Sequence, residues 1–313
     1  MLASASRSCV NCDGVIVVHR PSCMRDGKQA GRPQKHPYQS YRRRGARIRH
    51  FKGGRESVDR GWGDADPWPV GFTDADAAAL YDLLNPWDPT SWPGDAFYTG
   101  LVMAADSVLD VGCGMGSMLK HARGLGHAGR LAGIDPDVAM LERARTRTDI
   151  EWVEGRAVDI AWTEEFELAT MTGHAFQFLI SDDELRASLA AIRRALRDGG
   201  RFAFETRHPQ ARAWEEWAQA EPSEVVDASG RVLRQSHAVE SVVDGVVMLA
   251  ETTTDADGTV LRVDRAAMRF LDVEPLNAFL TEAGFTIEAQ YGDWHGRPIT
   301  DASREIITIA RSA

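Results

Sequence analysis

Short apolar runs alternate with amphipathic segments through the middle of the chain. The runs have the length of buried strands and cover residues 108–111, 130–134, 150–153, 166–171 and 201–206. The segments between them repeat apolar residues at helical spacing and cover residues 116–125, 137–147 and 182–197. Strands that alternate with helices of this length predict an α/β fold. Its sheet should be doubly wound and mostly parallel, with helices on both faces.

The pattern changes after His208-Pro209. From residue 223 to 272, β-rich runs are separated by Ser-Gly and Asp-Gly pairs typical of hairpin turns, at 229–230, 244–245 and 257–258. We therefore predict an antiparallel β insertion that covers the ligand crevice as a lid. The main sheet resumes with a helix and two strands, at 275–283, 285–290 and 305–310.

Two helices are expected before the first strand. In the first, Asp74 caps a segment that runs to Leu84 and is stopped by Asn85-Pro86. A link rich in Trp and Pro leads to a second short helix around Tyr98. The aromatic side chains of this region either fill the edge of the core or cover the ligand crevice.

Charge divides the chain into a basic start and an acidic body. Residues 1–60 contain 14 Lys and Arg against 4 Asp and Glu, whereas the remainder contains 22 against 42. The basic segment is predicted to be a disordered tail, with a nucleic-acid arm or a targeting segment as alternatives. The acidic body disfavours a nucleic-acid substrate and favours a small molecule. We expect a main domain of residues 61–207 and 273–313, with the lid at 208–272.

Cysteine usage and the length of the apolar runs bear on the protein's environment. Four cysteines stand at uneven positions, so no disulfide framework is predicted and a reducing cytoplasm is expected. No apolar run is long enough for a membrane span, and none near the start has the length of a secretory signal. Cys9, Cys12, His19 and Cys23 are ligand types that zinc accepts. No second ligand set accompanies them, so a metal site is not predicted.

One strand ends in an acid and runs into a glycine turn. Asp110 is followed by Gly112, Gly114 and Gly116, at the point where the strand should give way to a helix. Glycine allows a sharp bend and a close approach of the backbone to a ligand. In doubly wound folds the ligand crevice lies at the carboxyl ends of the strands. The turn is therefore predicted to bind a nucleotide-like ligand.

The spacing of the glycines separates two ligand classes. A dinucleotide fingerprint would place its third glycine at 117, where this chain has Ser117. Such a fingerprint also has no acid two residues before the first glycine, where this chain has Asp110. A carboxylate at Asp110 suits an ammonium group instead. On these residues the sequence resembles the class I S-adenosylmethionine-dependent methyltransferases, whose first motif is an acid followed by G-x-G-x-G. An NAD-linked oxidoreductase is the disfavoured alternative.

The resemblance implies S-adenosyl-L-methionine as the cofactor and suggests which residues bind it. Asp135, which ends the second strand, would take both ribose hydroxyls, and Met140 would contact the adenine. The family usually has an acid after the third strand, but Arg156 stands there, so adenine recognition falls to backbone groups or to Asp159. The cofactor-binding set is Asp110, Gly112, Gly114, Gly116, Asp135, Met140, Arg156, Ala157 and Met171.

The acceptor side is predicted at the end of the fourth strand, which in the family flanks the transferring methyl. His174 is the candidate general base because imidazole titrates near neutrality, with a packed, structural histidine as the alternative. Tyr81 is the second catalytic candidate, since the resemblance places such a tyrosine over the cofactor; the alternative is a core aromatic. Less specific candidates for substrate binding are Arg207, His208, Trp294 and His295.

These patterns together predict an S-adenosylmethionine-dependent methyltransferase of a small molecule. A Gly-His or similar polar pair stands at Gly173-His174 in the resembling N-methyltransferases, including those that act on amino sugars and on glycine. An amine nitrogen is therefore favoured over oxygen or carbon as the acceptor. A cofactor-binding protein without transfer activity is a third alternative. Neither nucleic acid nor a membrane is predicted as a partner.

Overall fold

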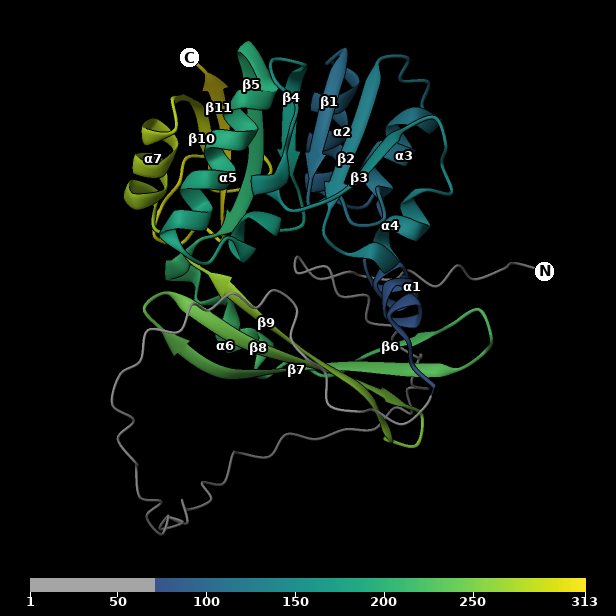
Figure 1. Cartoon of the computed structure of the whole chain (residues 1–313). Helices are drawn as coiled ribbons and strands as arrows, with labels where there is room; N and C mark the ends of the chain where they lie inside the picture. Colours follow the sequence, from purple (N-terminus) through teal and green to yellow (C-terminus); the bar gives the residue numbers. More distant parts are fainter. Residues whose placement is uncertain (1–70) are drawn as a thin grey trace, which may run out of the picture. The chain divides into compact units, whose positions relative to one another are not determined.

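A seven-stranded sheet forms the main layer, in the order β10-β11-β5-β4-β1-β2-β3 (Figure 1). The computed structural model describes residues 71–313. The strands of this sheet are β1 (Ser107–Val111), β2 (Arg130–Asp135), β3 (Glu151–Glu154), β4 (Phe166–Met171), β5 (Leu196–Arg207), β10 (Phe285–Tyr291) and β11 (Glu305–Ser312). Strands β1 to β5 pair in parallel, and β11 pairs antiparallel with both β5 and β10. The predicted mostly parallel α/β sheet is confirmed.

Helices cover both faces of the main sheet, since alternate side chains of a strand point to opposite faces. Those on this sheet are α2 (Pro93–Met103), α3 (Ser117–Gly124), α4 (Val138–Ala144), α5 (Asp182–Ala195) and α7 (Val273–Glu282). The other helices of residues 71–313, α1 (Asp74–Leu84) and α6 (Ala213–Trp217), pack mainly elsewhere. Helices α5 and α7 share a buried cluster with Leu109 and Phe204. Helices α2 and α3 share another with Val108 and Ala203. Burial of both faces explains the continuous apolar runs of these strands.

A second sheet of four antiparallel strands follows β5, in the order β6-β7-β8-β9 and drawn in green in Figure 1. Its strands are β6 (Ser223–Val226), β7 (Val232–Val243), β8 (Val246–Asp255) and β9 (Val260–Arg269). Strands β7 and β8 pair as a long hairpin whose turn is Asp244-Gly245, with φ of 49° and 76°. Asp and Gly tolerate this left-handed conformation, so the turn forms where the sequence predicts it. The antiparallel insertion is confirmed.

Helix α1 begins differently from the prediction. Its N-cap is Thr73, and Asp74 is already the first helical residue. The Thr73 side chain accepts a hydrogen bond from the Asp76 backbone N–H, and the Asp76 carboxylate accepts one from the Thr73 backbone N–H at 2.8 Å. This reciprocal pair satisfies two backbone donors, whereas a cap at Asp74 would satisfy one.

Helix α1 packs against the second sheet. Leu80 and Leu84 lie in a buried cluster with Leu233 of β7. The Arg262 guanidinium of β9 donates to the Asp74 carboxylate at 2.6 Å. The first helix of the described chain is therefore held by strands that come much later in the sequence.

The junction of α5 and β5 also departs from the prediction. The helix ends at Ala195, and the strand begins at once at Leu196, whereas the sequence predicts a helix to residue 197 and a strand from residue 201. Leu196 is fully buried and pairs with Phe166, and the regular pairing with β4 resumes at Arg201. Burial of Leu196 favours an extended backbone before the predicted start of the strand.

Several predictions fall outside what the structure describes. The basic segment and the array of Cys9, Cys12, His19 and Cys23 precede residue 71. Residues 71–313 belong to one compact unit, and the predicted domain boundaries stay a prediction. Within residues 71–313, no helix is both long and apolar enough to cross a membrane.

Candidate functional site

The glycine turn lies at the carboxyl end of β1, where the strand meets α3. Gly112, Gly114 and Gly116 have φ of +73°, +52° and +70°, a conformation that residues with a Cβ rarely adopt. A Cβ on Gly116 would also overlap the ring of Trp152. The turn thus needs glycine for its backbone shape, and at Gly116 also for room.

Two carboxylates flank the glycine turn. Asp110 is 1% exposed and accepts a hydrogen bond from the Thr170 hydroxyl at 2.8 Å. Burial raises the pKa of Asp110 to about 7, although the Thr170 hydroxyl acts in the opposite direction. Asp135 ends β2 and accepts backbone N–H groups from Gly114 at 2.7 Å and Asp137 at 2.8 Å. Burial raises the pKa of Asp135 as well, and these two N–H donors partly offset the shift.

The residues after β2 and β3 lie at the same edge of the sheet. Met140 is half-buried in the first turn of α4. Ala157 is buried in a 3-10 turn, residues 157–159, whose exposed cap is Arg156. The Arg156 backbone N–H donates to the Asp159 carboxylate at 2.9 Å. One oxygen of the Asp159 carboxylate is therefore already used within this turn, which leaves less of its acceptor capacity for the predicted alternative role as an adenine contact.

His174 follows β4, after the buried Met171. Its φ of +60° is unusual for a residue with a side chain, and its backbone N–H donates to the Glu205 carboxylate at 2.9 Å. Its ring Nε2 lies 3.0 Å from the nearer carboxylate oxygen of Glu305. Glu205 is buried and also accepts the Tyr98 hydroxyl. Burial raises the pKa of Glu205, whereas the charge of His174 lowers it.

Tyr81 of α1 faces the turn that carries His174. A Cβ built on Gly173 would lie 3.9 Å from the Tyr81 hydroxyl oxygen. The residue keeps 46% of its surface exposed, so it is not a core aromatic. Desolvation raises the pKa of Tyr81, and the charges of Glu251 and Asp135 raise it further. The charge of Arg207 acts in the opposite direction.

The less specific candidates make separate contacts. Arg207 ends β5, stacks its guanidinium on Trp217 at 4.8 Å and donates to the side-chain oxygen of Gln177 at 3.2 Å. Trp294 packs edge-on against Tyr98, with 5.8 Å between the ring centroids. Two histidines form hydrogen bonds within their own turns: the ring of His208 accepts the Gln210 N–H, and the His295 N–H donates to Asp293.

The sequence did not predict three residues of this hydrogen-bonded cluster: Glu205 and Glu305, which contact His174, and Tyr98, which contacts Glu205. Glu205 had a signal, because an acid interrupts the apolar run of β5 close to its carboxyl end. Glu305 had none, since it opens a strand whose place beside β5 follows from the sheet order alone. Tyr98 was placed on the second predicted helix, but nothing in the local sequence pairs it with Glu205.

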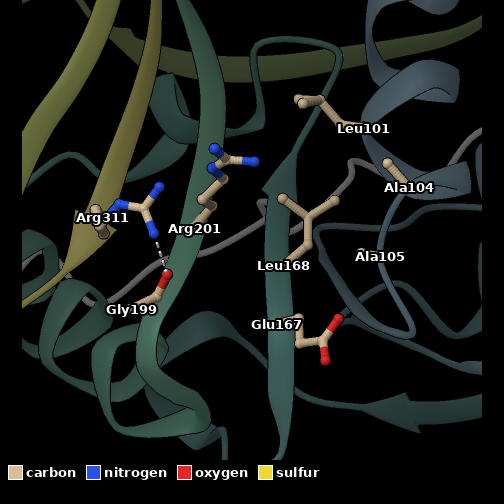
Figure 2. Close-up of a pocket in the computed structure, with 8 residues that line it drawn as sticks. All are labelled: Leu101, Ala104, Ala105, Glu167, Leu168, Gly199, Arg201 and Arg311. Atoms are coloured by element: carbon tan, nitrogen blue, oxygen red, sulfur yellow. Dashed lines mark hydrogen bonds between the residues drawn. The ribbon is translucent and has the colours of Figure 1, made fainter.

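Two cavities lie at different ends of the main sheet. One, of about 260 Å³, opens near the amino end of β4 (Figure 2), whereas His174 follows the carboxyl end of that strand. Its two arginines, Arg201 and Arg311, are both paired with Glu288, and it lacks the reactive groups of the carboxyl edge. The other, of about 350 Å³, adjoins the glycine turn and is lined by Asp82, Met115, Ser117, Lys120, Arg143 and Thr146. The cluster around the glycine turn and His174 is therefore the candidate active site.

Comparison with known proteins identifies the family. A family profile described as a methyltransferase domain matches residues 108–200, which span the glycine turn, Asp135 and His174. The chain belongs to the class I S-adenosylmethionine-dependent methyltransferases. This methyltransferase is 29% identical over 157 residues to the 2-phytyl-1,4-naphtoquinone methyltransferase of Trichormus variabilis, which covers 45% of this chain and 67% of the relative.

Other relatives match more of the chain. The cypemycin N-terminal methyltransferase of a Streptomyces species is 26% identical over 218 residues, covering 65% of this methyltransferase and 82% of the relative. The S-adenosylmethionine-bound structure of CalS10, an amino pentose methyltransferase from Micromonospora echinaspora, superposes with a TM-score of 0.57 at 21% identity. It covers 79% of this chain and the whole of that one. The predicted fold, enzyme class and cofactor, S-adenosyl-L-methionine, are confirmed.

The backbone and the carboxylates at the carboxyl edge of the sheet fit this cofactor. The glycine turn leaves backbone where side chains would otherwise block a ligand, and the buried Asp110 offers a negative partner for an ammonium group. Asp135 uses only part of its acceptor capacity on two backbone N–H groups. When bound, the cofactor supplies a methyl group activated by a sulfonium.

Proposed function

We propose that this methyltransferase transfers a methyl group to the nitrogen of a small-molecule amine, with His174 as the general base. One observation carries the proposal: at the end of β4 the imidazole of His174 lies 3.0 Å from the Glu305 carboxylate, while Glu205 accepts the backbone N–H of the same residue. An amine is mostly protonated near neutral pH and must lose a proton before its lone pair can attack. A general base beside the acceptor meets this need.

The proposed cofactor contacts follow the family pattern. Asp110 would hold the amino group, the glycine turn would lie along the methionine part and ribose, and Asp135 would accept the ribose hydroxyls. Met140, Ala157 and Met171 would supply apolar surface to the base and the methyl. Arg156 is exposed, so we assign it a backbone role only.

The charge of the crevice supports a cationic acceptor. Glu251 of β8 accepts a hydrogen bond from the Gln235 side chain at 2.6 Å and lies 3.1 Å from the His237 ring. Its charge reaches the Tyr81 hydroxyl, whose pKa it raises. Carboxylates from both sheets therefore act on the Tyr81 hydroxyl and outnumber the one arginine, Arg207, whose charge also reaches it. This balance favours an ammonium group over an acidic acceptor.

The relatives bear on the acceptor atom. The cypemycin relative is an N-terminal methyltransferase and the CalS10 structure is of an amino pentose methyltransferase, which supports nitrogen. The naphtoquinone methyltransferases match a smaller share of this chain. A quinone or phenol is therefore the alternative that the experiment has to include.

An acceptor screen tests the proposal. The protein is incubated with methyl-labelled cofactor and a panel of amino sugars, alkylamines, phenols and quinones, and we expect label in amines. His174→Ala should lower kcat on the best amine by about 100-fold, the loss of one general base, and leave the affinity for S-adenosylhomocysteine unchanged. His121→Ala, in the last turn of α3, is the matched control. Label confined to phenols or quinones, or full turnover by His174→Ala, would contradict the proposal.

A further inference from the structure

A carboxylate from β11 holds the imidazole of His174. The ring Nε2 lies 3.0 and 3.2 Å from the two carboxylate oxygens of Glu305. Both side chains are mostly buried, at 18% and 17% exposed. A hydrogen bond shielded in this way fixes the plane of the ring more firmly than an exposed one.

The donor in this hydrogen bond follows from the chemistry of the two groups. An ionised carboxylate only accepts, so Nε2 must carry the hydrogen. In a neutral imidazole the other nitrogen, Nδ1, is then the unprotonated one and can take a proton. The same carboxylate stabilises the cation that forms when Nδ1 is protonated.

A second carboxylate fixes the backbone beneath the ring. Glu205 accepts the His174 backbone N–H at 2.9 Å and is itself held by the Tyr98 hydroxyl. This contact stabilises the left-handed backbone conformation of His174. The residue is thereby restrained at both ends, by Glu205 at the backbone and by Glu305 at the ring.

Glu305 has no competing partner among residues 71–313. It stands in register with Arg207 of the neighbouring strand. The Arg207 guanidinium, however, donates to Gln177 and stacks on Trp217. Within the part of the chain that the structure describes, the hydrogen bonds of the Glu305 carboxylate go to His174.

We infer that Glu305 is a positioning residue for the methyl transfer: it selects the tautomer of His174 that presents Nδ1 to the acceptor and stabilises the resulting imidazolium. The inference rests on the proposed role of His174 as the base. The acceptor ammonium gives one proton to Nδ1, while Nε2–H keeps its hydrogen bond to the Glu305 carboxylate. With the cofactor bound, the freed nitrogen lone pair would form the bond to the methyl carbon, and the electron pair of the breaking carbon–sulfur bond would stay on the sulfur.

Steady-state kinetics on the full chain with the best amine from the screen provide the first test. Glu305→Gln should lower kcat at least about tenfold, as loss of an orienting carboxylate does elsewhere, with KM for the cofactor unchanged. Glu305→Asp, which keeps the charge, should recover part of that loss. Glu288→Gln, which removes another ion-paired carboxylate of the same sheet, is the matched control and should keep full activity.

A double variant separates a positioning role from a structural one. If Glu305 acts through His174, Glu305→Gln should cause no further loss in the His174→Ala background. An equal loss in both backgrounds would overturn the inference and leave the base role of His174 standing. Full activity of His174→Ala would overturn the base role itself, and this inference with it.

The tautomer can be observed directly. In the ¹⁵N-histidine NMR spectrum of the wild-type protein, the His174 resonances, assigned by their loss in His174→Ala, should show the proton on Nε2. Glu305→Leu, which has no acceptor, should populate the other tautomer, whatever its activity. Persistence of the Nε2–H tautomer in this variant, with melting unchanged, would contradict the inference.

Discussion

At the scale of single residues, burial controls the chemistry of Asp110. The carboxyl group ends a strand that is buried on both faces, and its pKa is raised to about 7 because ionisation there is costly. The folded protein therefore keeps a proton that the unfolded chain releases at much lower pH. An ammonium group next to the carboxylate would favour the ionised form.

The first prediction concerns stability and pH. Between about pH 4 and pH 7 the native state binds more protons at Asp110 than the unfolded state, so the free energy of unfolding falls as pH rises. From this group the slope is at most about 1.4 kcal/mol per pH unit. Asp110→Asn should remove this slope, which urea unfolding at pH 5 and pH 8 measures as the difference between variant and wild type.

Cofactor binding should show the opposite trend with pH. S-adenosylhomocysteine carries an ammonium group, so the wild-type affinity should rise as Asp110 ionises through about pH 7. Isothermal titration of Asp110→Asn should show weaker binding with a flatter pH dependence. Parallel pH profiles for the two proteins, in stability and in affinity, would contradict the assigned role of Asp110.

At the scale of elements, α1 links the second sheet to the active site. One side of the helix buries Leu84 against Leu233 of β7, and Asp82 forms an ion pair with Arg143 of α4 at 2.7 Å. The ion pair is exposed and contributes little, so apolar burial is the main interaction that docks the helix. Tyr81, next to Asp82, takes its position from this docking.

The second prediction concerns that docking. Leu233→Ala should lower the free energy of unfolding by about 2–4 kcal/mol, because it leaves a cavity under α1. It should also lower kcat/KM for the acceptor by displacing Tyr81, although Leu233 lies on the second sheet and not on the main sheet that carries the cofactor motif. Val243→Ala, an exposed position of the same strand at 61% exposure, is the control and should change neither quantity. Unfolding curves measure the free energy of unfolding, and steady-state kinetics measure kcat/KM. An unchanged kcat/KM in Leu233→Ala would show that the docking of α1 does not affect catalysis.

At the scale of the whole molecule, the crevice takes charge from both sheets. Glu205 and Glu305 belong to the main sheet, and Glu251 belongs to the second sheet. The sequence did not predict that a carboxylate of the β insertion, such as Glu251, would act at the site. A chain whose described body is acidic thus directs several carboxylates toward the place where we propose that an amine binds.

The third prediction tests this arrangement. Glu251→Gln should raise KM for a cationic amine by up to about tenfold, which corresponds to about 1.4 kcal/mol, and leave KM for the cofactor unchanged. Glu240→Gln, which removes a carboxylate paired with Arg265 on the same sheet, is the control. Added salt should weaken amine binding in the wild type more than in Glu251→Gln, because screening acts on the same attraction. An unchanged KM would place Glu251 outside the acceptor site.

The sequence by itself determined the features that depend on neighbours along the chain. Strands β1 and β2, the glycine turn, Asp110 and Asp135 follow from local apolar runs and from backbone shapes that only glycine adopts easily. The hairpin turns of the second sheet are local in the same sense. These features were sufficient to predict the fold, the family and the cofactor.

The tertiary structure alone decided which side chains surround His174. Glu205 and Glu305 meet it because β11 lies antiparallel beside β5, an order that no local pattern encodes. Tyr81 reaches the same turn because α1 is held by β7, far along the chain. Such contacts arise from the burial of apolar faces across the whole molecule. A reading of local sequence therefore finds the cofactor motif and misses the residues that orient the proposed base.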